Sequence, residues 1–128
     1  MGLIYQAESY QIKGAAIRVY RALGCGFLEA VYHECLEMEF TKRGIPFASQ
    51  KVLELAYEGV RLRQNFKADF VCFEKIIVEI KAVAYLAPEH QAQLINYLKA
   101  TGMQLGFLLN FGHHPLLEEI RIPNIAKE

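Results

Sequence analysis

The chain has 128 residues, of which 53% are hydrophobic and 22% charged, and its 14 basic residues balance its 14 acidic ones. This composition is typical of a folded domain, and the length suits one domain spanning residues 1–128. The charge balance argues against a strongly basic nucleic-acid coat protein. No apolar run reaches the roughly 20 residues that span a bilayer, and we expect no signal peptide. We therefore expect a cytoplasmic protein that does not contact membranes.

The first third of the chain predicts two helices. Apolar residues at helical spacing predict a helix over residues 4–23, ended by Gly24 and Gly26, because glycine accepts the positive φ angles of a helix end. A second helix is expected over residues 27–43, with Gly44 after its last turn. Its predicted apolar stripe consists of Leu28, Val31, Cys35 and Met38. Its polar side, expected to face solvent, carries His33, Glu34 and Glu37.

The rest of the chain predicts an α/β fold. Residues rich in β-branched side chains predict strands over 47–57, 60–73, 76–82, 104–110 and 119–122, and Pro88 begins a helix that ends near Thr101. The expected fold is a small mixed β-sheet of about five strands, in the order ααβββαββ, flanked by helices. The long connection through the third helix predicts a right-handed crossover, which would make the strands before and after it parallel.

Three charged residues interrupt the apolar strands of the central hairpin, namely Asp69, Glu79 and Lys81. Unpaired buried charges are costly, so such groups are usually paired or bind a metal. Because side chains alternate along a strand, Glu79 and Lys81 share one face. Asp69 joins them only if the loop between the two strands has an odd number of residues, since a two-residue loop would place it on the opposite face.

The chemistry of these side chains suits a divalent cation. Two facing carboxylates raise one another's pKa unless a cation lies between them. Mg²⁺ takes oxygen ligands and is often bound by one or two carboxylates together with substrate phosphates. Lys81 could orient or activate an attacking water on the same face. The alternative is a partly exposed ladder of salt bridges that adds little stability, and the hairpin alone does not decide between the two.

Two motifs in this half of the chain resemble those of known nucleases. Asp69, followed by Glu79 and Lys81 at the end of the next strand, resembles the D…(D/E)xK signature of the PD-(D/E)xK nuclease superfamily. Gln93 and Tyr97 lie four residues apart, on one face of the third helix, and resemble the QxxxY motif of its RecB-like branch.

Two further motifs extend the resemblance over nearly the whole chain. Residues 26–32 match GxxExxY, the string that names a family of small bacterial proteins assigned to the same superfamily. Residues 108–112, LLNFG, resemble a downstream segment of that family. The chain is therefore identified, from four ordered motifs, as a member of this RecB-like branch.

The resemblance implies a role for each motif residue. Asp69 and Glu79 match metal ligands for Mg²⁺ or Mn²⁺, and Lys81 matches the catalytic lysine. Glu29 matches the motif glutamate, which implies an additional metal ligand, directly or through water. The alternative for Glu29 is a favourable position near the positive end of the helix dipole. Tyr32, one turn further along, is expected to pack with its hydroxyl as a polar handle.

The third helix carries the remaining candidates. Gln93 and Tyr97 could each hold Lys81 or a substrate phosphate, or could serve the fold alone. His90 matches a position that is commonly polar in the family, and a surface role is equally compatible with the sequence. A basic patch around Arg61, Arg63 and Lys67 is a further interpretation, with a solvated strand face as its alternative.

The leading hypothesis is a metal-dependent nuclease that hydrolyses phosphodiester bonds of nucleic acid, with DNA favoured over RNA. The alternative is a catalytically silent or partner-dependent module with a nuclease fold, which binds nucleic acid or takes part in an assembly. Neutral charge and small size favour this alternative, because a short domain has little surface for gripping a duplex. A homodimer could supply the missing groove.

Overall fold

The computed structural model describes residues 3–124. Its helices and strands follow the predicted order and are α1 (Gln6–Leu23), α2 (Glu29–Lys42), β1 (Phe47–Tyr57), β2 (Val60–Cys72), β3 (Ile76–Lys81), α3 (Pro88–Thr101), β4 (Leu105–Asn110) and β5 (Glu118–Pro123). The strands form one sheet in the order β1-β2-β3-β4-β5. As predicted, β3 and β4 are parallel, and the other neighbours are antiparallel. Within residues 3–124, no helix is long and apolar enough to cross a membrane.

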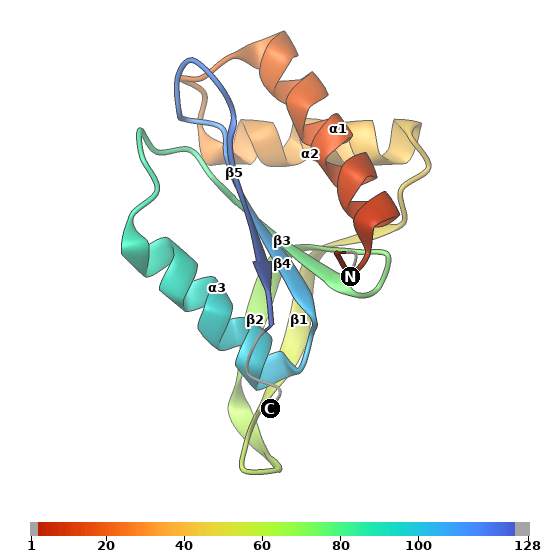
Figure 1. Ribbon diagram of the computed structural model, residues 1–128, viewed down its shortest axis with the longest axis vertical. Helices are drawn as coiled ribbons and strands as arrows, with labels where there is room; N and C mark the ends of the chain where they lie inside the picture. The colour runs from red at the N-terminus through yellow and green to blue at the C-terminus, as the bar shows by residue number, and fades with distance from the viewer. Residues whose placement is uncertain (1–2, 125–128) are drawn as a thin grey trace.

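Helices cover both faces of the sheet (Figure 1). On one face, α1 and α2 pack over a core that includes Ile76, Val78 and Ile80 of β3. On the other face, α3 packs over a second core, to which β3 contributes Ile77. Because side chains alternate along β3, Glu79 and Lys81 lie on the α3 face, as Ile77 does.

The predicted apolar stripe of α2 is wrong. The buried residues of this helix are Tyr32, Leu36 and Phe40, which recur at intervals of four residues. Leu28 precedes the helix as its N-cap residue and is 78% exposed, and Met38 is 65% exposed. The buried face is the one that carries two aromatic rings, which remove more apolar surface from water than the predicted stripe would.

Tyr32 packs with its hydroxyl engaged, as expected. Its ring stacks on Phe111 with a centroid distance of 4.8 Å. The hydroxyl donates to the Gly24 carbonyl at 2.6 Å and accepts from the Phe27 N–H at 3.2 Å. These contacts tie the loop between α1 and α2 to the buried core. They therefore set the position at which α2 begins, and Glu29 is its first residue.

Candidate active site

The sheet forks between β2 and β3. β2 pairs with β1 along almost its whole length, but it pairs with β3 only from Phe70 to Cys72, opposite Ile76 to Val78. The loop between them has three residues, 73–75, and the first two have positive φ angles. This odd length confirms the expected condition, and the register places Asp69 opposite Glu79, where the pairing ends.

The two carboxylates lie at the fork and bind the backbone of the opposite strand. Glu79 Oε2 accepts from the Asp69 N–H at 3.0 Å, and Asp69 Oδ2 accepts from the Ile80 N–H at 2.8 Å. Each bond satisfies a backbone group at the point where the strands separate. The positions of both carboxylates are therefore set by the main chain rather than by flexible side-chain contacts.

A local irregularity turns Asp69 toward α2. The pair Gln50–Asp69 is missing from the β1–β2 ladder, and Gln50 has a φ of 56°. On either side of it, Ala68 belongs to the α3 core, whereas Phe70 belongs to the α1 and α2 core. Strict alternation would place Ala68 and Phe70 on the same face of the sheet. Since they lie on opposite faces, the alternation of β2 is interrupted at Asp69.

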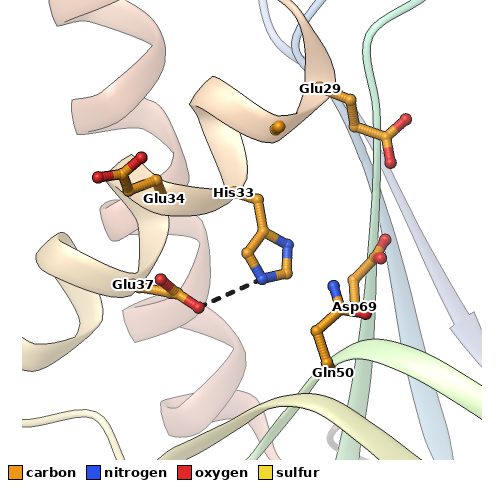
Figure 2. Close-up of a pocket in the computed structure, with 7 residues that line it drawn as sticks. Glu29, His33, Glu34, Glu37, Gln50 and Asp69 are labelled. Carbon is orange, nitrogen blue, oxygen red and sulfur yellow. Dashed lines mark ion pairs between the residues drawn. The ribbon is translucent and has the colours of Figure 1, made fainter.

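Asp69 consequently borders an open pocket of about 460 Å³ between β2 and α2 (Figure 2). The pocket is lined by Glu29, Ala30, His33, Glu34, Glu37, Gln50 and Asp69. Figure 2 shows the carboxylates of Glu29 and Asp69 directed toward one another on one side of it. Partial burial raises the pKa of Glu29, and the negative charge of Asp69 raises it further. The Glu29 carboxylate therefore faces the pocket and interacts electrostatically with Asp69.

Glu79 has the most strongly shifted carboxyl of the site. Burial, followed by the negative charge of Asp69, raises its pKa to about 8. Without a cation, Glu79 is thus largely protonated at neutral pH. A divalent ion beside Asp69 and Glu79 would offset both causes, because it compensates burial of the charged form and neutralises the neighbouring carboxylate. The donor set, made of carboxylate oxygens, fits Mg²⁺ or Mn²⁺.

This pKa shift predicts a pH-dependent stability for the metal-free protein. The unfolded chain loses the Glu79 proton near pH 4.5, and the folded chain only near pH 8. Between these values the folded state binds more protons, so the free energy of unfolding should fall as pH rises. When unfolding is measured in urea at pH 5 and pH 9 without metal, the free energy of unfolding of Glu79→Gln should fall less between the two pH values than that of the parent. At pH 9 the free energy of unfolding of Glu79→Gln should exceed that of the parent by a few kcal/mol, and by less than about 5.

The matched control for this measurement is Glu89→Gln, which removes an exposed carboxylate from α3. This variant should keep the parent's difference between the two pH values. A Glu79→Gln protein whose stability follows the parent at both pH values would contradict the raised pKa.

Lys81 lies on the α3 side of the fork, in a narrow crevice. The crevice is lined by Phe66, Glu79, Lys81, His90, Gln93, Leu94, Tyr97 and Leu108. It holds only about 10 Å³, near the minimum that a single water needs. Among residues 3–124, Lys81 forms no ion pair. A phosphate therefore does not fit between Lys81 and α3 in this arrangement, whereas the pocket beside Asp69 is open.

The α3 candidates surround Lys81 in different ways. Tyr97 stacks face to face on Phe66, with a centroid distance of 3.7 Å and an interplanar angle of 8°, so its ring braces β2 against α3. Gln93 lines the crevice and forms no hydrogen bond within the described part of the chain. His90 Nδ1 accepts from the Ala87 N–H at 3.0 Å and thereby caps the start of α3.

His33 was expected to face solvent, and this expectation is wrong. Its ring stacks on Phe70 at a centroid distance of 4.2 Å. Its Nε2 lies 2.7 Å from Ser49 Oγ and 3.4 Å from Glu37 Oε2. His33 is four residues after Glu29, so it lies on the same side of α2. That spacing is the signal that could have placed it in the pocket.

Asn110 is a second residue that the sequence reasoning did not single out. It is fully buried at the end of β4, opposite Lys81 in the parallel register. Its Oδ1 accepts from the N–H groups of Val83, at 3.0 Å, and Gly112, at 3.1 Å. Its Nδ2 donates to Glu118 Oε1 at 3.0 Å. The asparagine of LLNFG therefore holds the backbone that follows Lys81.

The predicted metal ligands are not gathered into a closed cage. Within residues 3–124, no three His, Cys, Asp or Glu side chains come together as a preformed metal site. Asp69 lies between the other two predicted ligands, because it is hydrogen-bonded to the strand that carries Glu79 and it also lies near Glu29. Two carboxylates suit an ion such as Mg²⁺, which retains several waters and takes substrate phosphates as further ligands.

The sheet therefore forks with a carboxylate on each strand and a lysine two residues beyond the second, in the order of the D…(D/E)xK pattern. A family model described as the PD-(D/E)XK nuclease superfamily matches residues 6–122. The chain belongs to the PD-(D/E)XK nuclease superfamily. A comparison with curated protein sequences finds no significant match.

Two solved structures are similar in fold. The crystal structure of SSO0001 superposes with a TM-score of 0.57 at 20% sequence identity, over 74% of this chain and 49% of SSO0001. The alkaline exonuclease LHK-Exo from Laribacter hongkongensis superposes with a TM-score of 0.53 at 12% identity, over 97% of this chain and 72% of the exonuclease. The chain thus spans about half the length of the first of these proteins and nearly three quarters of the second.

Proposed function

We propose that this protein is a metal-dependent nuclease that hydrolyses phosphodiester bonds of nucleic acid, with DNA preferred over RNA. The observation that carries the proposal is the fork, where Asp69 and Glu79 are each fixed by a backbone N–H of the opposite strand. Lys81 follows two residues later on β3 and has no ion-pair partner within residues 3–124. Lys81 lowers the pKa of both Glu79 and Glu29, so its charge acts on the carboxylates of the site without being tied to one of them in an ion pair, which favours a role in chemistry.

Asp69 and Glu79 would hold Mg²⁺ or Mn²⁺, and Glu29 would be a further ligand across the pocket, directly or through a water. The bound ion supplies Lewis-acid polarisation of the phosphate and lowers the pKa of a bound water. The pocket of about 460 Å³ beside Asp69 and Glu29 would admit the phosphate. Because Glu79 must lose its proton to become a ligand, metal binding should release protons below pH 8.

Lys81 would orient the attacking water and balance the negative charge that develops on the phosphate. Its ammonium group offers three donors and no acceptor, so it can hold a water oxygen but not remove its proton while charged. The crevice is too small for a phosphate, which supports a role for Gln93 in positioning Lys81 rather than substrate. Tyr97 would act through its stack on Phe66, by holding α3 against the strand that carries Asp69.

Cleavage of labelled single-stranded and duplex DNA, with RNA of the same sequence as a comparison, tests the proposal. We expect cleavage with Mg²⁺ or Mn²⁺ and none in EDTA, and a loss of at least about a hundredfold in Lys81→Ala. The matched control is Lys99→Ala, which removes an exposed lysine from α3 and should retain activity. Absence of cleavage of every substrate with both metals would overturn the proposal, and equal rates for the two variants would remove Lys81 from the mechanism.

Two observations favour the second candidate, a module that becomes active only when it binds a partner. The tight crevice around Lys81 and the lack of a three-ligand metal cage within residues 3–124 fit a site completed on assembly. A second copy of the chain is one such partner. Light scattering with calorimetry of Mg²⁺ and Mn²⁺ binding distinguishes the candidates. A monomer that binds metal and cuts supports the nuclease, whereas no metal binding favours the module.

A further inference from the structure

The β1–β2 ribbon extends beyond the fork as an arm, defined here as residues 51–68. Within residues 3–124, the part of β2 that precedes Asp69 has β1 as its only strand neighbour, and residues 56–65 are all exposed. In Figure 1 the arm reaches beyond the remaining strands and the end of α3. The outer part of the arm, residues 56–65, contributes no buried side chain, so its length is not explained by packing of the core.

The two faces of the arm differ. Phe66 stacks on Tyr97 of α3, so the Phe66 side chain lies on the face of the arm that is turned toward α3. Arg63 lies further along β2, where the β1–β2 register shifts, and is exposed. By alternation, Lys67 and Asn65 lie on the face opposite to Phe66. That face is on the α2 side of the sheet, where the pocket beside Asp69 opens. Lys67, Asn65 and Arg63 are defined here as the row, which begins two residues from Asp69.

The row is positively charged and available. Lys67 and Arg63 are exposed, and neither forms an ion pair within residues 3–124, whereas Arg61 further along is paired with Glu54 at 3.2 Å. The chain as a whole has a net charge of zero, so this local excess is a feature of the arm. Val52 is the cross-strand neighbour of Lys67 and is 50% exposed, which leaves an apolar surface beside this lysine.

We propose that the Arg63–Lys67 row binds the phosphates of the nucleic-acid strand that enters the active site at Asp69. This inference rests on the proposed function and adds to it the surface that grips the substrate. Charge complementarity favours a polyanion over a second copy of this neutral chain. Because Lys67 is two residues from Asp69, which lines the pocket, the row would lie near the scissile phosphate. The exposed Val52 provides a surface on which a base can lie.

The test is equilibrium binding of a fluorescent DNA oligonucleotide, single-stranded and duplex, in EDTA and at several salt concentrations. The charge-reversal variant R63E/K67E should bind at least about tenfold more weakly than the parent. The neutral variant R63Q/K67Q should lower the slope of log K against log salt by roughly 1.5, since each lost phosphate contact lowers it by roughly 0.7 to 0.9. The matched control is R18E/K99E, which changes the net charge equally at exposed sites on α1 and α3 and should bind like the parent.

Cleavage of the same oligonucleotides with Mg²⁺ separates this inference from the proposed function. If binding is lost in R63E/K67E and kept in R18E/K99E, phosphate binding by the row is supported. If no cleavage occurs in that case, only the nuclease proposal fails. If the parent cleaves DNA and R63E/K67E binds it as tightly as the parent, the proposed role of the row is overturned and the nuclease proposal stands. Equal losses in both charge-reversal variants, or no binding by the parent, also overturn the role of the row. Circular dichroism of each variant establishes that the fold is retained.

Discussion

Asp69→Asn should reduce metal-dependent cleavage by at least about a hundredfold and should stabilise the metal-free protein at alkaline pH. The amide oxygen of asparagine can still accept the Ile80 N–H, so the fork should keep its geometry. The lost charge is the second-largest cause of the raised pKa of both Glu79 and Glu29. Its removal relieves the repulsion between the carboxylates while it removes the shared metal ligand.

Cleavage rates and urea unfolding at pH 9 measure the two effects of Asp69→Asn together. The control is Glu34→Gln, which neutralises another carboxylate of the same pocket and should leave cleavage within a few-fold of the parent. Loss of activity together with a gain in stability identifies a residue retained for chemistry. A variant that cuts at a rate similar to the parent would contradict the assignment of Asp69. A variant that loses stability would contradict the repulsion.

Gly112→Ala should destabilise the fold by more than about 3 kcal/mol, because the added methyl group has no space. A Cβ at this position would lie 2.5 Å from Val83 N, 2.6 Å from Ala82 C and 2.6 Å from Val83 O. All three contacts are with backbone, so no rotation of a side chain relieves them. The backbone in question directly follows Lys81, so any accommodation would shift the site.

Chemical denaturation of Gly112→Ala beside Gly59→Ala tests this steric account. Gly59 has a positive φ of 81° and no atom within 4 Å of a built Cβ, so its replacement should cost only about 1 kcal/mol from backbone strain. Equal losses in the two variants would show that the close approach at Gly112 is not the cause. The folded fraction of Gly112→Ala should also cut more slowly than the parent.

The motifs near the fork could be predicted because they depend on local periodicity. Alternation along β3 placed Glu79 and Lys81 on one face. The position of Asp69 was conditional on the loop length, and β2 ends at Cys72 rather than at the predicted Phe73, which gives the three-residue loop and places Asp69 opposite Glu79. The orientation of Asp69 could not be predicted. It depends on the missing Gln50–Asp69 pair and on the change of face between Ala68 and Phe70, neither of which has a signal in the strand pattern.

On α2, two stripes with helical spacing compete in the sequence, and only tertiary packing distinguishes them. Phe111 stacks on Tyr32, and Phe70 packs edge-on against Phe40, so the aromatic stripe is buried. This choice rotates Glu29 and His33 toward the pocket and leaves Met38 exposed. The same limit applies to α3, where local spacing could not predict that Tyr97 stacks on Phe66.

The sequence by itself determined the order of helices and strands, the parallel pairing across α3, and the strand face shared by Glu79 and Lys81. The element order and the shared face follow from local periodicity, and the parallel pairing follows from the length and handedness of the connection through α3. Only the tertiary structure decided which face of α2 is buried and how the fork fixes its carboxylates. It also decided that Glu29 and Asp69 line the same open pocket, with their carboxylates directed toward one another. These features depend on packing between distant segments, which no local pattern encodes.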